Sequence, residues 1–265
     1  MRRLLLLIAL ILGLGLFKIS GQDPESNGRA FSFPFGKAGI SIGNSYTFNG
    51  IRFNFADSNV QRINGLNLTL WTKYKSVYNK DATINGISLG VFPTVKRMQP
   101  VNIFILGAAG VEYLNGISIA GIGIASGNIN GVCIGGAMLG GEKINGLTLS
   151  GLFSYSEKHF SGMTISGLAV LSRGDINGLS ACIAGIYSEG AIRGTAVTAG
   201  YLKAGTTKGF TFSGYANINQ VNGLSISLIN IARELHGVQI GILNFAGNNR
   251  KGLKLLPFIN MHLTG

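Results

Sequence analysis

Residues Ile144–Lys158 read INGLTLSGLFSYSEK, and close relatives of this stretch recur along nearly the whole chain. The copies align on one glycine, here Gly146, and most neighbouring copies lie 14 to 16 residues apart. The exceptions are a first spacing of 11 residues and a spacing of 21 residues that contains the insertion WTKYKSVYNK. Such a regular period predicts a repeat protein whose units stack on one another. The aligned glycines are Gly39, Gly50, Gly65, Gly86, Gly116, Gly131, Gly146, Gly162, Gly178, Gly194, Gly209, Gly223, Gly237 and Gly252, and a degenerate unit between Gly86 and Gly116 has Val101 in this place.

Within one unit, the glycine is often preceded by asparagine, as in Asn145-Gly146. Asn-Gly pairs favour tight turns, and glycine is required where φ is positive or where a neighbouring backbone approaches closely. The next three residues alternate apolar, polar, apolar, as in Leu147–Leu149, which is typical of a half-buried strand. The small residues Ser150-Gly151 then predict a bend, followed by a second short strand over Leu152–Tyr155.

The apolar pattern distinguishes two architectures. In the next unit the apolar pair Met163 and Ile165 is followed by Leu168 and Val170, five residues later instead of four. One long barrel strand would keep a period of two, whereas two short strands joined by a bend allow this shift. The sequence therefore predicts an all-β fold, a parallel β-solenoid of about fifteen coils of 14–16 residues and roughly 70 Å in length. An antiparallel β-barrel is the alternative, because both faces are apolar in the last units, around residues 224–231.

Composition divides the chain into three parts. Residues 1–21 contain Arg2 and Arg3, an apolar run and then small residues, which is the order of a secretory signal peptide. Residues 22–36 are predicted to be a linker and an N-terminal cap, and residues 37–265 form the β-repeat domain. With 46% apolar and 12% charged residues the chain can bury a core and is not a disordered polymer. We therefore expect an exported, folded protein.

The chain is basic, with a formal net charge of +12 that falls to +9 without Arg2, Arg3 and Lys18. A basic surface favours anionic partners, here a cell-surface glycan or lipopolysaccharide, and no feature predicts specific nucleic-acid binding. The charged residues also fall near repeat boundaries, where solvated turns require polar side chains. Cys133 and Cys182 occupy different repeat positions, so we expect small buried residues, although the sequence does not exclude a pair.

The C-terminal third carries a resemblance to a known family. The run of Asn-Gly units, the stretch ARELHGVQIGILNFAGNN at residues 232–249 and the ending GLKLLPFIN at residues 252–260 resemble bacterial surface-repeat proteins of the leptospiral type. The resemblance covers residues 48–263 and implies an exported, surface-associated repeat protein, with no catalytic residue to carry over. Most units here depart from the family's Val-Gln-Ile-Gly, because Ser or Thr replaces Gln, so binding properties do not transfer with it.

Candidate catalytic patterns are explained by the repeat. The pattern G-x-S-x-G, which positions a nucleophilic serine in hydrolases, occurs at residues 39–43 and 86–90, but no helical pattern follows either match. His159, His236 and His262 are isolated, so neither a metal site nor a cofactor is predicted. The insertion is the best candidate for ligand contact, because it departs from the repeat and combines aromatic with basic side chains. The residues of this candidate loop are Trp71, Lys73, Tyr74, Lys75, Tyr78 and Lys80.

These observations favour an exported, non-enzymatic repeat protein with a structural or adhesive role at the cell surface, in the outer membrane or in the periplasm. An outer-membrane β-barrel protein is the alternative function. A carbohydrate-active enzyme built on a β-helix is a third hypothesis, which requires two acidic side chains that converge. The acidic residues of the repeat region instead lie apart at predicted turns, at Asp57, Asp81, Glu112, Glu142, Glu157, Asp175, Glu189 and Glu234.

Overall fold

The computed structural model describes residues 28–33, 37–72, 82–93 and 95–263. The predicted signal peptide and the first residues of the predicted linker lie outside these ranges. The strands are β1 (Gly28–Phe33), β2 (Ala38–Ser45), β3 (Thr47–Asp57), β4 (Arg62–Thr72), β5 (Thr83–Phe92), β6 (Arg97–Phe104), β7 (Gly107–Ala120), β8 (Gly123–Gly135), β9 (Met138–Ser150), β10 (Phe153–Ser166), β11 (Ala169–Ser172), β12 (Asp175–Cys182), β13 (Gly185–Thr198), β14 (Tyr201–Ala246) and β15 (Leu255–His262).

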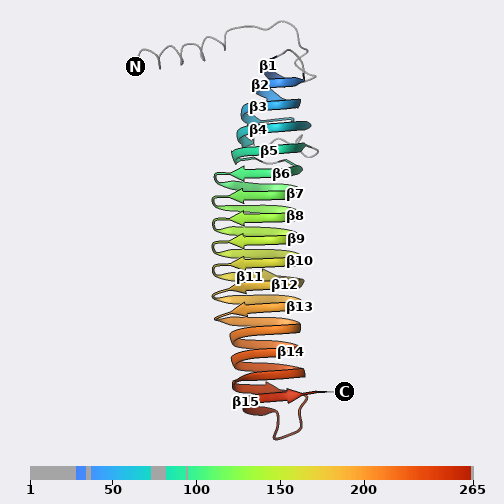
Figure 1. The fold of residues 1–265 in the computed structure, drawn as a ribbon, viewed down its shortest axis with the longest axis vertical. Coiled ribbons are helices and arrows are strands. Elements are labelled where there is room, and N and C mark those ends of the chain that lie inside the picture. The colour runs from blue at the N-terminus through green and yellow to red at the C-terminus, as the bar shows by residue number, and fades with distance from the viewer. Residues whose placement is uncertain (1–27, 34–36, 73–81, 94, 264–265) are drawn as a thin grey trace, which may run out of the picture.

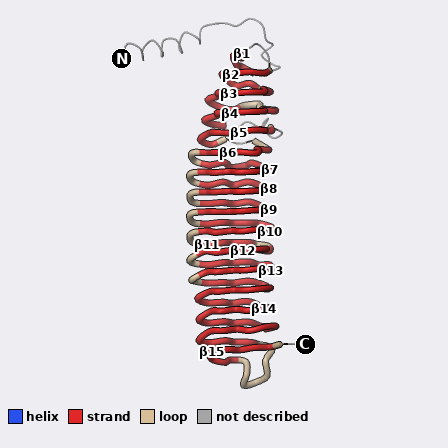
Figure 2. Tube along the Cα trace, in the orientation of Figure 1, coloured by secondary structure: helices blue, strands red, loops and turns tan. Residues whose placement is uncertain are grey.

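The strands wind into a parallel β-solenoid, which forms a straight rod (Figure 1). From β2 to β14 neighbouring strands pair in parallel, and Gly146 of β9 pairs with Gly131 of β8 and with Gly162 of β10. Figure 2 shows that strand covers most of the rod and that the bends gather along one edge. The predicted parallel solenoid is confirmed. The alternative of an antiparallel barrel is wrong, because successive coils stack along an axis in parallel register.

Antiparallel strands lie at both ends of the stack. β1 pairs with β2, and β15 pairs with the end of β14, where Ile259 lies opposite Ile240. These strands interrupt the parallel coil register and cover edges to which other chains could add. Gly252, predicted to be the last aligned glycine, lies in the turn before β15, and a Cβ there would meet no atom within 4 Å. The stack therefore contains fewer than the fifteen coils predicted.

The aligned glycines other than Gly252, called the glycine column below, lie inside strands. Gly146 belongs to β9 and has a φ of +114°. A Cβ on Gly146 would overlap the carbonyl oxygen of Gly131 in the preceding coil. The prediction that this position requires glycine is confirmed, but the predicted Asn-Gly turn is wrong, because the chain stays in the parallel ladder on both sides of the glycine.

The degenerate unit differs from its predicted alignment. β6 pairs Pro100 with Gly86 and Val101 with Ile87, so Pro100 occupies the glycine column. Val101 is instead the first residue of the apolar, polar, apolar triplet. The backbone contact of the column is kept, because a Cβ on Gly116 would meet the carbonyl oxygen of Pro100.

The asparagines before the column form a ladder of side-chain amides. Asn64 donates to Asn49 at 2.6 Å, and Asn85 donates to Asn64 at 2.8 Å. Farther along the rod, Asn145 donates to Asn130 at 2.9 Å. Identical amides in stacked strands can bond one coil to the next in this way. Asparagine at this position therefore links coils along the axis instead of shaping a turn.

Each central coil has a bend and an irregularity. The predicted bend at Ser150-Gly151 is found one residue later, at Gly151-Leu152, where β9 ends and β10 begins. The second strand segment accordingly begins at Phe153 instead of Leu152. A register shift between Ser156 and His159 interrupts the pairing of β10 with β9. The bend and this shift divide the coil into segments that enclose a narrow interior.

The interior has an unexpected polarity. In the triplet after each column position, the middle residue points inward: Thr164 is 3% exposed, whereas its neighbours Met163 and Ile165 are 41% and 40% exposed. A half-buried strand usually has the opposite arrangement. The inward row, called the inner polar row, is at most 3% exposed and comprises Ser41, Arg52, Asn67, Ser88, Asn102, Ser118, Thr148, Thr164, Ser180, Thr211, Ser225 and Gln239.

Apolar packing fills the remaining interior. Ile144 and Ile176, each two residues before a column glycine, are 1% exposed, and Val170 and Ile186, each eight residues after one, are fully buried. Several inner polar groups bond from one coil to the next, as Thr211 does to Ser225 at 3.0 Å and Asn102 to Ser118 at 3.2 Å. The rod is therefore held together by backbone ladders, apolar rows and hydroxyl or amide ladders, with the remaining apolar side chains directed outward.

Candidate interaction surface

The outward apolar residues form two rows, called the outer apolar rows, at one and three residues after each column position, and Thr195 is the polar member of the first row. They follow one side of the rod through successive coils. Monomeric soluble proteins rarely expose apolar patches larger than a few hundred Å², so a side of this length indicates an interaction surface. The members that are between 37% and 57% exposed are Ile40, Ile42, Ile51, Phe53, Ile87, Ile103, Ile117, Ile119, Met163, Ile165, Phe212 and Ile240.

A second apolar feature, called the ridge, lies at the bends next to these rows. It consists of large apolar residues five or six positions after the column, which in the central coils is the position of the bend. Ile105 at 68% and Ile183 at 65% are among the most exposed apolar side chains of the described chain. The ridge comprises Phe55, Leu70, Trp71, Ile105, Leu106, Ile122, Leu152, Leu168, Ile183, Leu228, Ile229, Ile242 and Leu243.

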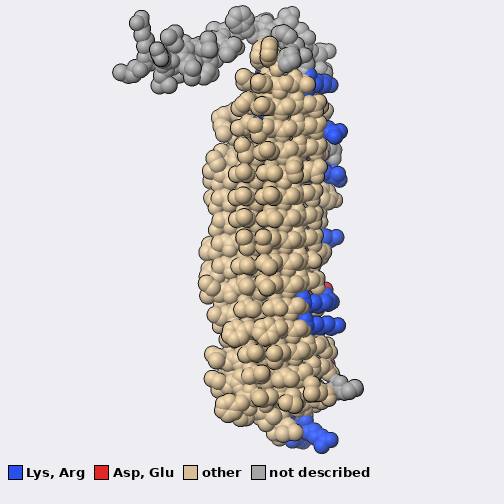
Figure 3. All heavy atoms as spheres, in the orientation of Figure 1, with Lys and Arg blue, Asp and Glu red and all other residues tan. Residues whose placement is uncertain are grey.

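In the coils from Gly86 onward, charged residues gather on the remaining side of the rod. The coils from Gly86 to the one that begins at Gly237 share a charge pattern. In these coils the nine residues after each column position contain a single charged residue, Lys203. All others lie between the tenth residue and the next column glycine, in what we call the charged side. Figure 3 shows a face without charged side chains in its middle and with Lys and Arg along one edge. The rod is thus amphipathic along its length.

Ion pairs link neighbouring coils on the charged side. Lys158 donates to Glu142 at 2.6 Å, and this contact lowers the pKa of Glu142 and raises that of Lys158. A hydrogen bond from the backbone N–H of Ala191 and a second one from Arg193 lower the pKa of Asp175. These exposed pairs each stabilise the fold weakly, and they keep charge on one side.

Several acidic residues of the described chain are engaged by basic residues of neighbouring coils. Glu112 and Glu157 lie 3.6 Å from Lys96 and Arg173 respectively, each in an ion pair with a neighbouring coil. Asp81 lies outside the described residues. The structure contains no group of three His, Cys, Asp or Glu residues suited to a metal ion within its described residues.

The serines of the two G-x-S-x-G matches are inaccessible. Ser41 and Ser88 both belong to the inner polar row and are 0% exposed. The Ser41 hydroxyl donates to Ser45 at 3.2 Å, inside the coil. A substrate cannot reach either hydroxyl without opening the stack.

The candidate loop is only partly described. Trp71 lies in β4, next to Phe92 of the following coil, with 6.1 Å between ring centroids. It is 48% exposed and occupies a ridge position. The other five predicted loop residues, Lys73, Tyr74, Lys75, Tyr78 and Lys80, lie outside the described residues.

A buried ion pair in the first coils was not predicted. Arg52, in the inner polar row, is fully buried and contacts Asp57 at 2.7 Å. Its guanidinium also donates to Asn67 at 2.8 Å and to Thr69 at 3.1 Å in the next coil. The sequence feature that could have indicated this pair is Arg52 itself, a charged residue at the middle position of the triplet 51–53. This enclosed network supports the fold and has no access to solvent.

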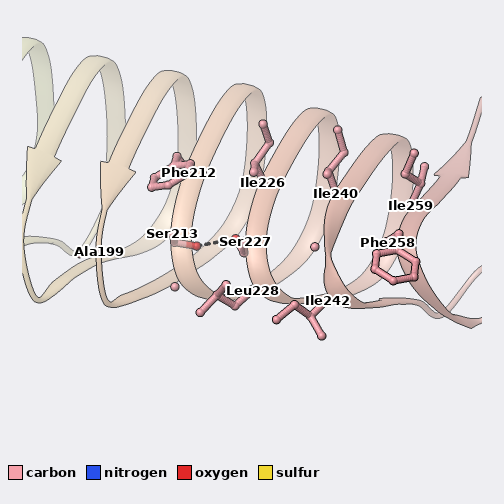
Figure 4. Close-up of a pocket in the computed structure, with 12 residues that line it drawn as sticks. Ala199, Phe212, Ser213, Ile226, Ser227, Leu228, Ile240, Ile242, Phe258 and Ile259 are labelled. Atoms are coloured by element: carbon pink, nitrogen blue, oxygen red, sulfur yellow. Dashed lines mark hydrogen bonds between the residues drawn. The ribbon is translucent and has the colours of Figure 1, made fainter.

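An apolar groove of about 690 Å³ lies near the C-terminal end of the rod, between the outer apolar rows and the ridge (Figure 4). Phe212, Ile226 and Ile240 line one wall, and Leu228 and Ile242 line the other. The bonded hydroxyls of Ser213 and Ser227 and the backbone of Gly214 and Gly241 form the floor, and Phe258 and Ile259 of β15 line the end. The volume is within the usual range of small-molecule sites.

Phe258 has an unusual backbone at the end of this groove. Its φ is +65° and its side chain is 74% exposed. Positive φ is costly for a bulky residue and is often retained at functional sites. The pairing of β15 with β14 is irregular here, between Gly241 and Asn244. The strained backbone of Phe258 therefore places its aromatic ring at the end of the groove.

The comparisons with known proteins identify no relative: no family model, curated protein or solved structure matches the chain. Within the described part of the chain there is no helix with the length and hydropathy needed to cross a membrane.

The two cysteines are both free, with Cys133 buried and Cys182 partly exposed.

Proposed function

We propose that the protein is an exported, non-enzymatic structural or adhesive protein of the bacterial cell surface. Its working part is the length of the rod, which presents the same side chains in coil after coil. The observation that carries this proposal is the segregation of charged and apolar side chains on different sides along the stack. A repeated surface of this kind favours many weak, regularly spaced contacts over a single reaction centre.

The arrangement of polar groups supports a non-enzymatic role. The serine and threonine hydroxyls that a repeat could offer as nucleophiles are turned inward, and Thr148 and Thr164 are 1% and 3% exposed. On the charged side, Glu142 and Asp175 are engaged by Lys158 and Arg193 of neighbouring coils. A general acid or nucleophile needs a partner group and access to substrate, whereas the carboxylates of Glu142 and Asp175 have basic partners.

Export is supported by the N-terminal sequence. Residues 1–21 have the charge and hydropathy order of a secretory signal. The resemblance of residues 232–260 to surface-repeat proteins points in the same direction. A basic charged side facing outward from the cell would suit an anionic glycan or lipopolysaccharide, since exposed positive charge attracts anionic polymers.

Location can be tested with lysine labelling on intact cells. Lys143, Lys208 and Lys251 are exposed on the charged side and its C-terminal extension, so a membrane-impermeant amine reagent should label them before lysis. Mass spectrometry of the labelled peptides and of the N-terminus would identify both the sites and any cleavage near residue 21. A cytoplasmic protein treated in the same cells is the control. Labelling of these lysines only after lysis would contradict the proposed location.

Contact with anionic glycans is tested separately. A variant with Lys143, Arg173 and Lys208 replaced by glutamine should lose salt-sensitive retention on an immobilised acidic polysaccharide, whereas substitutions on the apolar side should leave it unchanged. The interaction should weaken between 0.1 M and 1 M salt, because the screening length falls from about 10 Å to about 3 Å. Equal retention of both variants would argue against a role for the charged side.

A further inference from the structure

We propose that the rod lies lengthwise on a lipid bilayer, with the ridge inserted and the charged side turned toward anionic headgroups and water. The proposal rests on the proposed export, which would bring the chain to a membrane surface, but its assay uses purified components and can fail independently. Three properties of the rod favour this arrangement: the area of its apolar sides, their shape and the placement of charge.

The apolar area is large enough to need a covering partner. The segment with the outer apolar rows spans about four residues, or roughly 13 Å, and the stack rises by roughly 60 Å, so this side offers roughly 800 Å². The side beyond the ridge is of similar width and contains Phe153, Tyr155 and Leu171, which are 36–37% exposed. The two sides together exceed the largest apolar patch of a typical soluble monomer.

The shape favours lipid over a second copy of the chain. One flat side of about 800 Å² matches what one partner of a standard protein interface buries, so two copies could cover the outer apolar rows. Such a dimer would leave the ridge and the side beyond it in water, including Ile183 at 65% exposure. A bilayer covers a convex ridge together with both of its flanks, because acyl chains adapt to its shape.

Charge complementarity also favours lipid. In the coils from Gly86 onward, basic residues outnumber acidic ones on the charged side, and the ridge and its flanks contain one charged residue, Lys203. Amphipathic surfaces of this composition bind at the boundary between headgroups and acyl chains and prefer anionic lipid. The C-terminal groove, with Phe258 at its end, extends the inserted surface and is a place for one acyl chain.

The chain contains a natural probe of this insertion. Trp71 is its single tryptophan, occupies a ridge position and is 48% exposed. If the ridge inserts, Trp71 emission should shift to shorter wavelength with vesicles of phosphatidylcholine and phosphatidylglycerol. Vesicles made with brominated acyl chains should quench it. This measurement uses the unsubstituted chain and therefore does not depend on the folding of a variant.

Flotation on a density gradient provides the matched comparison. The ridge variant carries Ile122→Gln, Leu168→Gln and Ile183→Gln, and the control variant carries Lys143→Gln, Arg173→Gln and Lys208→Gln on the charged side. Both are compared with the unsubstituted chain, and all three must have the same N-terminus by mass spectrometry, because residues 4–17 are themselves apolar. Far-UV circular dichroism confirms that each is folded.

The ridge variant should partition at least tenfold less into both pure phosphatidylcholine vesicles and vesicles containing phosphatidylglycerol. The control variant should lose only the additional affinity for phosphatidylglycerol. Equal flotation of the ridge variant and the unsubstituted chain, or Trp71 emission unchanged by brominated lipid, would overturn the proposal. A dimer in solution that does not float with vesicles would also overturn the proposal if the ridge substitutions left that dimer intact. A second copy of the chain would then cover the outer apolar rows. Failure of surface labelling with successful flotation would remove the cellular location but leave lipid binding in place.

Discussion

Replacement of the column glycine by alanine tests the main structural explanation of the repeat. In Gly146→Ala the new Cβ would overlap the carbonyl oxygen of Gly131, and the residue would have to keep a φ of +114°. Gly131 cannot move away easily, because β8 pairs with a neighbouring strand on each side. We therefore expect two separate costs, one from backbone strain and one from steric overlap.

The magnitude follows from these two terms. A residue other than glycine held at unfavourable φ costs about 1–3 kcal/mol, and overpacking against a fixed neighbour costs about 1–3 kcal/mol more. Gly146→Ala should therefore destabilise the protein by about 2–6 kcal/mol. Two glycines separate the terms. Gly252 has a φ of +91° but open space around its Cβ, and Gly140 of β9 has open space and no positive φ.

The assay is urea unfolding followed by far-UV circular dichroism, together with hydrogen exchange of the β8, β9 and β10 amides. Exchange is needed because coils in a repeat protein can open locally and unfolding need not be two-state. Gly252→Ala should cost about 1–3 kcal/mol, and Gly140→Ala should be neutral or stabilise by about 0.4–1 kcal/mol, since alanine restricts the unfolded chain. If Gly146→Ala and Gly140→Ala changed stability equally, neither the overlap nor the positive φ would explain the glycine column.

Three further predictions concern the interior and the ladders. Asp57→Leu should increase hydrogen exchange in β3 and β4 by an amount equivalent to about 3–5 kcal/mol, because Arg52 would be left buried without its carboxylate. The double variant Arg52→Met, Asp57→Leu should recover much of that lost stability. If the single and double variants lost the same stability, the importance of the ion pair would be contradicted. Asn130→Ala removes one amide bond donated and one accepted, and should lower the free energy of unfolding by about 1–3 kcal/mol in urea titrations. Burial raises the pKa of Cys133 from 9.0 to about 12, so a thiol reagent should react with Cys182 first. Because the thiol ionises more readily in the unfolded chain, the folded state should lose stability as pH rises from about 9 toward 12. Rapid labelling of Cys133 in the native protein at pH 8 would contradict the burial of its thiol.

The period and the bend could be predicted from sequence because each has a local cause. A glycine every 14 to 16 residues reports a backbone contact that repeats, and small residues such as Gly151 report a bend. The predicted alignment is wrong at Pro100, because this unit has no glycine in the column and its triplet is the better guide to the register. Val101 to Ile103 form an apolar, polar, apolar triplet, and their pairing with residues 87–89 places the column one residue earlier.

The direction of the side chains could not be predicted from alternation alone. A period of two separates the faces of a strand but does not state which face is inside, and apolar residues are usually taken to be inward. Here a narrow coil has room inside for Thr148 and Ser150, and Ser150 bonds to Ser154 and Ser166 at 2.9 Å across and along the stack. The sequence held one further signal for the direction of these side chains. Charged residues gather on one side of the coil, so no residue in the row of Leu147 is charged.

This inversion changes which interactions stabilise the protein. In most folds the apolar residues of an alternating strand are buried on folding and supply much of its free energy. Here Ile117 and Ile165 remain 45% and 40% exposed, so the coil depends on the apolar rows of its interior, its backbone ladders, its amide ladder and its inner hydroxyls. The apolar residues are left able to gain free energy from whatever covers them, and a covering partner that binds only the folded rod must stabilise it. These side chains therefore bury only part of their area on folding and keep the rest for association, which is the physical reason to place the proposed function on the outer surface.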